Sequence, residues 1–203
     1  MHEEDQEQSL SRRGVIGVAS IVPLAALGAA PVAAAFPARQ LRIIEAFVER
    51  LIPSDAQGPG AKECGVPTYV DRSFASALAA ERPAFAVALD AIDALARARH
   101  NGAGFAELTV DRQDDVLTAM ETNDAAGFLP DSRTFFYRFR QLALEGMFGD
   151  PFYGGNRNFA GWDLLRYPGP RMAVSAADQR LKEPIKPLRT SAHGRQGGAR
   201  HGG

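Results

Sequence analysis

Few side chains in this sequence could bind a metal ion or act as a nucleophile. The chain has one cysteine, Cys64, and four histidines, of which His2, His193 and His201 lie near its ends. A Cys-ligated iron–sulfur cluster or structural zinc site needs several thiolates, which this chain alone does not supply. A catalytic triad or histidine-based metal site in the body of the chain would depend on His100 alone. The sequence therefore argues against an autonomous metalloenzyme.

Carboxylates offer a second route to chemistry. Asp55 and Asp150 each lie in a segment rich in glycine and proline, outside the apolar periodic stretches. If the fold brought Asp55, Asp150 and His100 into one cleft, they could act as acid and base on a small carbohydrate. A two-carboxylate mechanism requires the two groups within about 10 Å of each other. An autonomous carbohydrate-active enzyme is therefore one hypothesis, and it depends on how the elements fold.

The elements that would position these groups are helices. Apolar residues recur with helical spacing, and no segment shows sustained period-two alternation bounded by hairpin turns. We therefore predict an all-α fold, a single compact domain of about five helices. The predicted helices run from Pro37 to before Pro53, from about Pro67 through Phe74, from about Phe85 to Asn101, from Thr109 through Met120 and from Ser132 to Phe148.

The fifth predicted helix and the segment after it are unusually apolar and aromatic. The helix carries apolar residues on more than one face, which indicates a central position or contact with a partner. After Gly149 the periodicity stops, and a long irregular loop rich in Gly, Asn and aromatic residues is expected. We expect the helix and the loop together to leave apolar area for a partner to cover.

The first 35 residues have the organisation of an export signal. A polar start ends in Arg12 and Arg13, and an Ala-rich apolar stretch follows and closes in Ala33-Ala34-Ala35. A twin arginine ahead of an apolar stretch directs a chain to a translocase that moves folded proteins. We expect the twin-arginine route, a periplasmic location, and cleavage after Ala35 or Ala30. Retention of the apolar stretch as a membrane anchor is the alternative, since its length is also that of a membrane span.

Composition sets the remaining bounds. The chain has 203 residues, of which 45% are hydrophobic, enough for one globular domain. With 23 Lys+Arg and 24 Asp+Glu the net charge is −1, so no global field favours nucleic acid, and no nucleic-acid partner is expected. The sequence divides into a signal over 1–35, a helical domain over 36–170, and a basic tail over 171–203 that we expect to be disordered.

Several motifs occur in one order between about residues 40 and 170. The first half holds FVERLIPSD at 47–55, GPGA at 58–61, GVP at 65–67 and YVDR at 69–72. The second half holds EGMFGDP at 145–151, YGGN at 153–156, GW at 161–162 and YPG at 167–169. Together these motifs resemble the gluconate 2-dehydrogenase subunit 3 family. Two features depart from or lie outside the pattern: the residues directly after the twin arginine, Gly14-Val15-Ile16-Gly17, and the tail beyond Pro170.

The resemblance implies a non-catalytic small subunit of a heteromeric, flavin-dependent dehydrogenase that oxidises a sugar, sugar acid or polyol. In such complexes a large subunit of the glucose-methanol-choline (GMC) oxidoreductase type holds FAD, and a multi-haem cytochrome c subunit often accepts the electrons. The small subunit brings the twin-arginine signal and escorts the folded large subunit through the twin-arginine translocase. No cofactor is then expected in this chain, and it lacks the Cys-x-x-Cys-His motif of covalent haem attachment.

Candidate contact residues follow from the aromatic loop. Aromatic residues dominate interface hot spots, so this loop is the expected contact with the partner. The candidates are Phe148, Asp150, Pro151, Tyr153, Gly154, Gly155, Asn156, Phe159 and Trp162. A structural cap is the other interpretation of this loop, and both roles can coexist. Cys64 is either a small buried residue or one half of an intersubunit disulfide.

Overall fold

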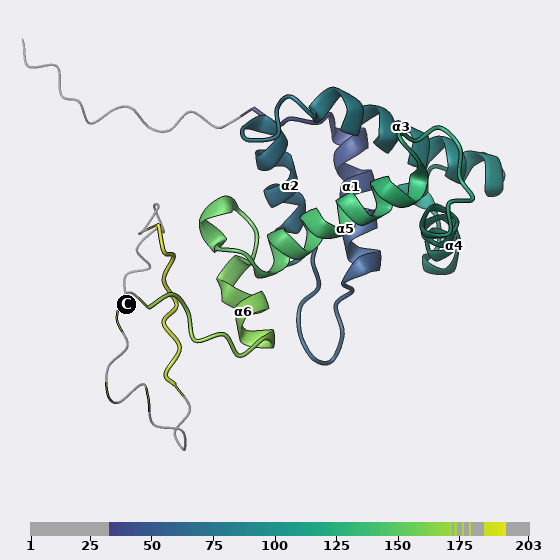
Figure 1. Ribbon diagram of the computed structural model, residues 1–203. Coiled ribbons are helices and arrows are strands. Elements are labelled where there is room, and N and C mark those ends of the chain that lie inside the picture. Colours follow the sequence, from purple (N-terminus) through teal and green to yellow (C-terminus); the bar gives the residue numbers. More distant parts are fainter. Residues whose placement is uncertain (1–32, 172, 174–175, 177–178, 180–184, 194–203) are drawn as a thin grey trace, which may run out of the picture. The chain divides into compact units, whose positions relative to one another are not determined.

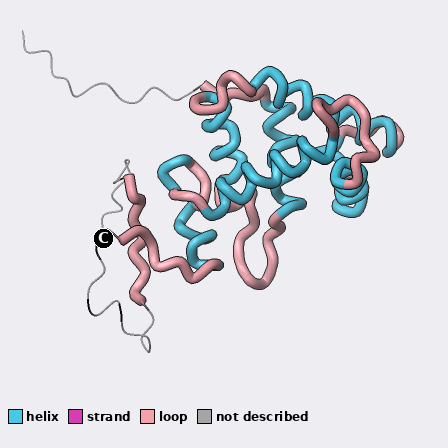
Figure 2. The backbone as a smooth tube through the Cα atoms, viewed as in Figure 1, coloured by secondary structure: helices cyan, strands magenta, loops and turns pink. Residues whose placement is uncertain are grey.

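The computed structural model describes residues 33–171, 173, 176, 179 and 185–193. Within these residues the fold is all-α, as predicted, and Figure 2 shows helices joined by loops. The α-helices are α1 (Ala38–Leu51), α2 (Val66–Ala75), α3 (Arg82–Arg99), α4 (Val110–Glu121), α5 (Ser132–Phe148) and α6 (Ala160–Leu164). Three short 3₁₀ turns are η2 (Phe105–Glu107), η3 (Pro151–Tyr153) and η4 (Arg157–Phe159).

Local sequence signals place most helix ends. Helix α1 starts directly after Pro37 and ends two residues before Pro53, because proline suits the first turn of a helix and cannot continue one. Helix α5 has the predicted bounds, and its cap is the side chain of Asp131, which accepts a hydrogen bond from Thr134 N. Thr109 caps α4 by position, but its side chain makes no capping hydrogen bond.

Helix α5 lies at the centre of the domain and packs against α1, α2 and α4 (Figure 1). Phe139 of α5 stacks on Phe47 of α1 with ring centroids 4.0 Å apart, and it meets Phe85 of α3 edge-on. Phe135 and Phe136 are also buried. The expectation that this helix leaves apolar area for a partner is therefore wrong for Phe135, Phe136 and Phe139, because the chain's own helices cover them, whereas Phe148 at its end is only partly buried.

The segment after α5 is more regular than expected. It contains η3, η4 and the five-residue helix α6 in place of one continuous irregular loop. A helix of five residues is too short to show a periodic pattern, so the sequence gives no local signal for it. Contacts with the end of α5, described below, hold it in place.

Two expectations concern the ends of the chain. The twin arginine at Arg12 and Arg13 lies outside the described residues. No helix in the described part of the chain is both long and apolar enough to cross a membrane. Residues 185–193, which fall in the tail expected to be disordered, are described and pack against the segment that follows α5.

Candidate functional site

The candidate contact loop is built on the C-terminal end of α5. The last carbonyl groups of a helix have no partner within the helix and need hydrogen-bond donors from elsewhere. Gly146 O accepts from the backbone N–H of Asn156 at 2.8 Å, and Phe148 O accepts from Trp162 Nε1 at 2.9 Å. The loop therefore caps this end of the helix.

Asn156 is the centre of this cap. Its side chain is fully buried; its Nδ2 donates to Gly149 O at 2.8 Å and its Oδ1 accepts from Gly161 N at 2.9 Å. The Asn156 side chain thus joins the end of α5 to the first turn of α6. The backbone N–H of Asn156 in addition donates to the carbonyl oxygen of Gly146. These bonds explain why a helix as short as α6 forms at all.

Two glycines let the backbone come this close. A Cβ on Gly155 would overlap the carbonyl oxygen of Gly146, and a Cβ on Gly161 would overlap that of Met147. Both clashes are with backbone atoms, which cannot rotate away as a side chain can. The Gly-Gly-Asn and Gly-Trp motifs therefore act together as the cap of α5.

Three residues of the loop have an unfavourable backbone conformation. Asn156, Asn158 and Phe159 have φ angles of 44°, 57° and 62°, in the left-handed region. Asparagine tolerates this region, whereas a bulky residue such as phenylalanine rarely adopts it. The surrounding contacts must hold Phe159 there, and its ring lies against Trp162 with centroids 5.3 Å apart.

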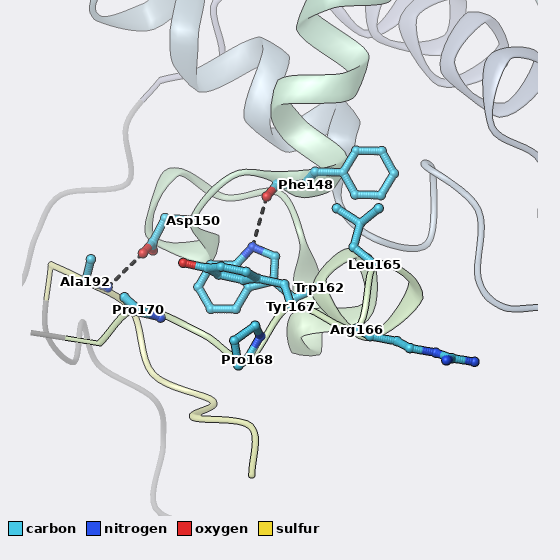
Figure 3. A pocket seen from close by; sticks show the side chains of 9 residues that line it. All are labelled: Phe148, Asp150, Trp162, Leu165, Arg166, Tyr167, Pro168, Pro170 and Ala192. Atoms are coloured by element: carbon cyan, nitrogen blue, oxygen red, sulfur yellow. Dashed lines mark hydrogen bonds between the residues drawn. The ribbon is translucent and has the colours of Figure 1, made fainter. Parts of the chain in front are cut away.

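A groove of about 560 Å³ opens on the outer side of this cap (Figure 3). Trp162 and Tyr167 lie at its centre, with Phe148 and Leu165 on one side and Asp150 on the other, while the Arg166 side chain points away from it. Among these aromatic residues Trp162 is buried and Tyr167 is exposed. The sequence had indicated Phe148, Asp150 and Trp162 as contact residues. It had not indicated Leu165 or Tyr167 as contact residues, and Tyr167 had appeared only as part of the Tyr-Pro-Gly motif.

Asp150 lies where the tail meets the loop. Its carboxylate accepts from Phe152 N at 2.9 Å and from Ala192 N at 2.7 Å. Partial burial alone raises the pKa of Asp150, but these two N–H groups, the Ser191 hydroxyl and the nearby His193 outweigh it and lower the pKa below its usual value. Asp150 is therefore a charged anchor for the tail at neutral pH.

The tail segment 185–193 runs along the same face through several polar contacts. Leu188 N donates to Pro168 O at 2.8 Å, and Arg189 forms an ion pair with Asp163 at 2.8 Å. His193 lies 3.2 Å from the hydroxyl of Tyr153. The ion pair is about half-exposed at each end, so it contributes little, and the segment is held by several weak contacts.

The predicted contact residues therefore fall into two groups. Gly155, Asn156 and Trp162 are buried and hold the loop, whereas Tyr153 is 48% exposed on the surface. Phe148, Asp150, Pro151, Gly154 and Phe159 are intermediate in exposure. Tyr153 is thus the candidate whose side chain a partner could reach without opening the loop.

Cys64 lies behind this loop. It is unpaired and buried, and its carbonyl accepts from Arg157 N at 2.8 Å. Burial, which removes water from the thiolate, raises the pKa of the Cys64 thiol, and the neighbouring Glu63 adds to the effect. An intersubunit disulfide at Cys64 would require the loop to open first.

The three groups of the enzyme hypothesis have separate surroundings. Asp55 closes a turn with Gly58 in the loop between α1 and α2 and accepts from Gln57 N at 2.7 Å. His100 follows α3, and its Nε2 lies 3.1 Å from Asp115 of α4. Helices α3 and α4 meet at one end of the domain, whereas Asp150 follows the other end of α5 (Figure 1). The structure does not bring the three together, and the described residues contain no cluster of three or more His, Cys, Asp or Glu that could hold a metal.

Comparison with known proteins accounts for the arrangement of motifs. The family model of gluconate 2-dehydrogenase subunit 3 matches residues 38–169, from the first residue of α1 to the end of the Tyr-Pro-Gly motif. The chain belongs to the gluconate 2-dehydrogenase subunit 3 family. It is therefore a small subunit of a dehydrogenase complex. Searches of curated proteins and of solved structures found no match.

The range matched by the family model includes the residues that build the loop. The caps of α5 at Asn156 and Trp162 and the close glycines Gly155 and Gly161 all lie within the matched range. The tail segment 185–193 lies beyond it. The family match thus includes the segment from the end of α5 to α6 but not the tail that packs against it.

Proposed function

We propose that this chain is a non-catalytic subunit that binds, stabilises and escorts an FAD-containing dehydrogenase of the GMC type, which oxidises a sugar, sugar acid or polyol. The family match over residues 38–169 carries this proposal. The arrangement of Asp55, His100 and Asp150 supports it, because each group is engaged with different neighbours. The reaction then belongs to the partner, which supplies the flavin.

The contact with the flavoprotein lies on the outer face of the α5 cap. Tyr153, Tyr167 and Leu165 are exposed there, at 48%, 42% and 59%. Aromatic side chains on a rigid support are favourable contact residues, because little side-chain entropy is lost when they are covered. The bonds of Asn156 and Trp162 supply the rigid support.

The escort role rests on the twin arginine at Arg12 and Arg13. A translocase that moves folded proteins suits a partner whose flavin is inserted before export. The small subunit supplies the signal, and the complex works in the periplasm. Where the complex includes a multi-haem cytochrome c subunit, that subunit accepts the electrons from the flavin.

Co-purification tests the contact. The chain is co-expressed with a GMC-type flavoprotein from the same genome, and the complex is captured through a tag on the flavoprotein. Tyr153→Ala combined with Tyr167→Ala is expected to reduce capture at least tenfold, since each hot-spot aromatic contributes about 2 kcal/mol. Tyr137→Ala is the matched control, because Tyr137 is 47% exposed but lies on α5 away from the cap. Equal capture of both variants and the wild type would contradict the proposed face.

Export is tested by changing the signal. Arg12→Lys with Arg13→Lys keeps the charge and removes the twin arginine that the translocase reads. The expected result is a flavoprotein that stays in the cytoplasm although it still binds the small subunit. A flavoprotein that reaches the periplasm in equal amount with the variant, or without the small subunit, would contradict the escort role.

A further inference from the structure

Just ahead of α1, one carboxylate of α2 holds the backbone of two consecutive residues. Asp71 Oδ1 accepts hydrogen bonds from Ala35 N at 2.9 Å and from Phe36 N at 3.1 Å. Phe36 is only 3% exposed and packs against Phe74 and Phe85, with ring centroids 5.3 and 5.8 Å away. Phe36 is therefore part of the packed core, although it lies two residues before the helix itself.

Asp71 has no cationic partner in the described part of the chain. Its hydrogen-bond partners are two neutral backbone N–H groups from consecutive residues, although its side chain is partly buried. By contrast, Asp90 and Asp93 both pair with Arg39 of α1. A partly buried carboxylate is stabilised most by a charged donor, because hydrogen bonds between charged groups are the stronger ones.

These contacts coincide with the end of the Ala33-Ala34-Ala35 motif. Ala33 and Ala34 are exposed, Ala35 is half-buried, and Phe36 is the first buried residue. Small residues directly before the cleaved bond are the mark of a signal-peptide cleavage site. Among the described residues, exposure thus falls from Ala34 to Phe36, where the motif ends.

We propose that processing cuts the bond between Ala35 and Phe36, and that Asp71 then binds the new N-terminus. This inference rests on the export signal of the proposed function. A signal peptidase adds water across the amide, so Ala35 leaves with a carboxylate and the nitrogen of Phe36 takes up protons to become an ammonium group. The ammonium offers three donors at the position from which the amide of Phe36 reaches Asp71. It replaces both neutral bonds with one charged interaction.

The folded domain permits this cut. The bond to be cleaved is held by two hydrogen bonds and the side chain of Phe36, and it lies outside α1. Terminal segments with few contacts open locally at low cost. After the cut, Phe36 returns to the aromatic cluster and its nitrogen to Asp71. Cleavage after Ala30 would instead leave a five-residue extension and keep Asp71 on neutral donors.

The first test is the N-terminus of the exported protein. Intact mass and N-terminal sequencing of the periplasmic subunit, purified in its complex, are expected to give Phe36. An exported chain that begins at Pro31, or one that retains residues 1–35, would overturn the assignment while leaving export intact. A chain that never leaves the cytoplasm would overturn both the export role and the processing.

The second test separates a charge role from a structural one. Asp71→Asn keeps an acceptor oxygen and removes the charge. It is made in the processed chain and in the unprocessed chain that carries Arg12→Lys and Arg13→Lys, and folding equilibria are measured by urea unfolding. Asp71→Asn lowers the folding equilibrium constant of both forms. We expect the factor by which it is lowered to be about fivefold larger in the processed chain, since only that form has an ammonium group at Asp71. Asp111→Asn, an exposed carboxylate on α4, is the control and is expected to affect both forms equally. Equal losses for Asp71→Asn in both forms would overturn the pairing.

Discussion

Replacing Asn156 by alanine tests whether the loop after α5 is held by its buried cap. The substitution removes the Nδ2 bond to Gly149 O and the Oδ1 bond from Gly161 N, both inside the protein. At about 1 kcal/mol per net hydrogen bond, these two losses cost roughly 2 kcal/mol. Alanine at a φ of 44° adds roughly 1–2 kcal/mol, because only glycine and asparagine adopt the left-handed region readily. The expected loss is therefore about 3–4 kcal/mol, a large share of the 5–15 kcal/mol typical of a domain.

Urea unfolding and thermal unfolding of the complete chain measure this loss. A loss of that size lowers the melting temperature of a chain of this length by about 10 °C. Asn158→Ala is the matched control, since Asn158 has a φ of 57° but an exposed side chain without a hydrogen bond. It should show only the backbone cost of roughly 1–2 kcal/mol.

The comparison of the two variants is decisive. If Asn156→Ala is no more destabilising than Asn158→Ala, the buried bonds do not hold the loop and the reasoning is refuted. A variant that keeps full stability but loses the flavoprotein would instead show that Asn156 makes a direct contact with it. Asn156→Gly also removes both side-chain bonds, but glycine adopts a positive φ without strain. Its loss of stability should therefore fall between those of the two alanine variants.

Three further outcomes follow from the same geometry. Gly161→Ala places a methyl group against the carbonyl of Met147 and is expected to lower stability by more than about 2 kcal/mol in urea unfolding, while a loss below about 0.5 kcal/mol would contradict the close approach. Tyr153→Ala removes an exposed ring and should change stability by less than about 0.5 kcal/mol while weakening capture of the flavoprotein; the reverse pattern would make Tyr153 a structural residue. The pKa of Asp150 is lowered in the folded state. Its contribution to stability is therefore complete above the pKa of the unfolded chain, about 4, and is lost as the pH falls below that value. Slow hydrogen exchange at the Ala192 amide should therefore persist down to about pH 4 and be lost below it, and loss of protection already near neutral pH would contradict the anchor.

The helical part of the fold could be predicted from sequence because its signals are local. Apolar residues three and four apart define the buried face of each helix. Helix starts and ends are marked by Pro37, Pro53, Gly102 and Asp131. The five long helices appear where these signals indicate. Helix α6 has no such signal, because it depends on Asn156 and Trp162, whose side chains bond to Gly149 and Phe148 at the end of α5, 7 and 14 residues away.

The candidate site was predictable in position but not in the role of each residue. The loop after α5 attracts attention by composition alone, and Tyr153 is exposed there as a contact residue should be. Trp162 and Asn156 belong to the same motifs, yet they are buried and bonded to main-chain groups of α5. Residue type does not separate the two roles, since aromatic and amide side chains serve both as anchors inside a protein and as contacts outside it.

By itself, the sequence determined an all-α chain, the bounds of its main helices and the family to which it belongs, because helical periodicity and ordered motifs are properties of neighbouring residues. Only the tertiary structure decided that Phe135, Phe136 and Phe139 of α5 are covered from within, that Asp55, His100 and Asp150 have separate surroundings, and that Asp71 binds the backbone of Ala35 and Phe36. Each of these depends on contacts between segments far apart in the chain, and such contacts are set by how the helices pack.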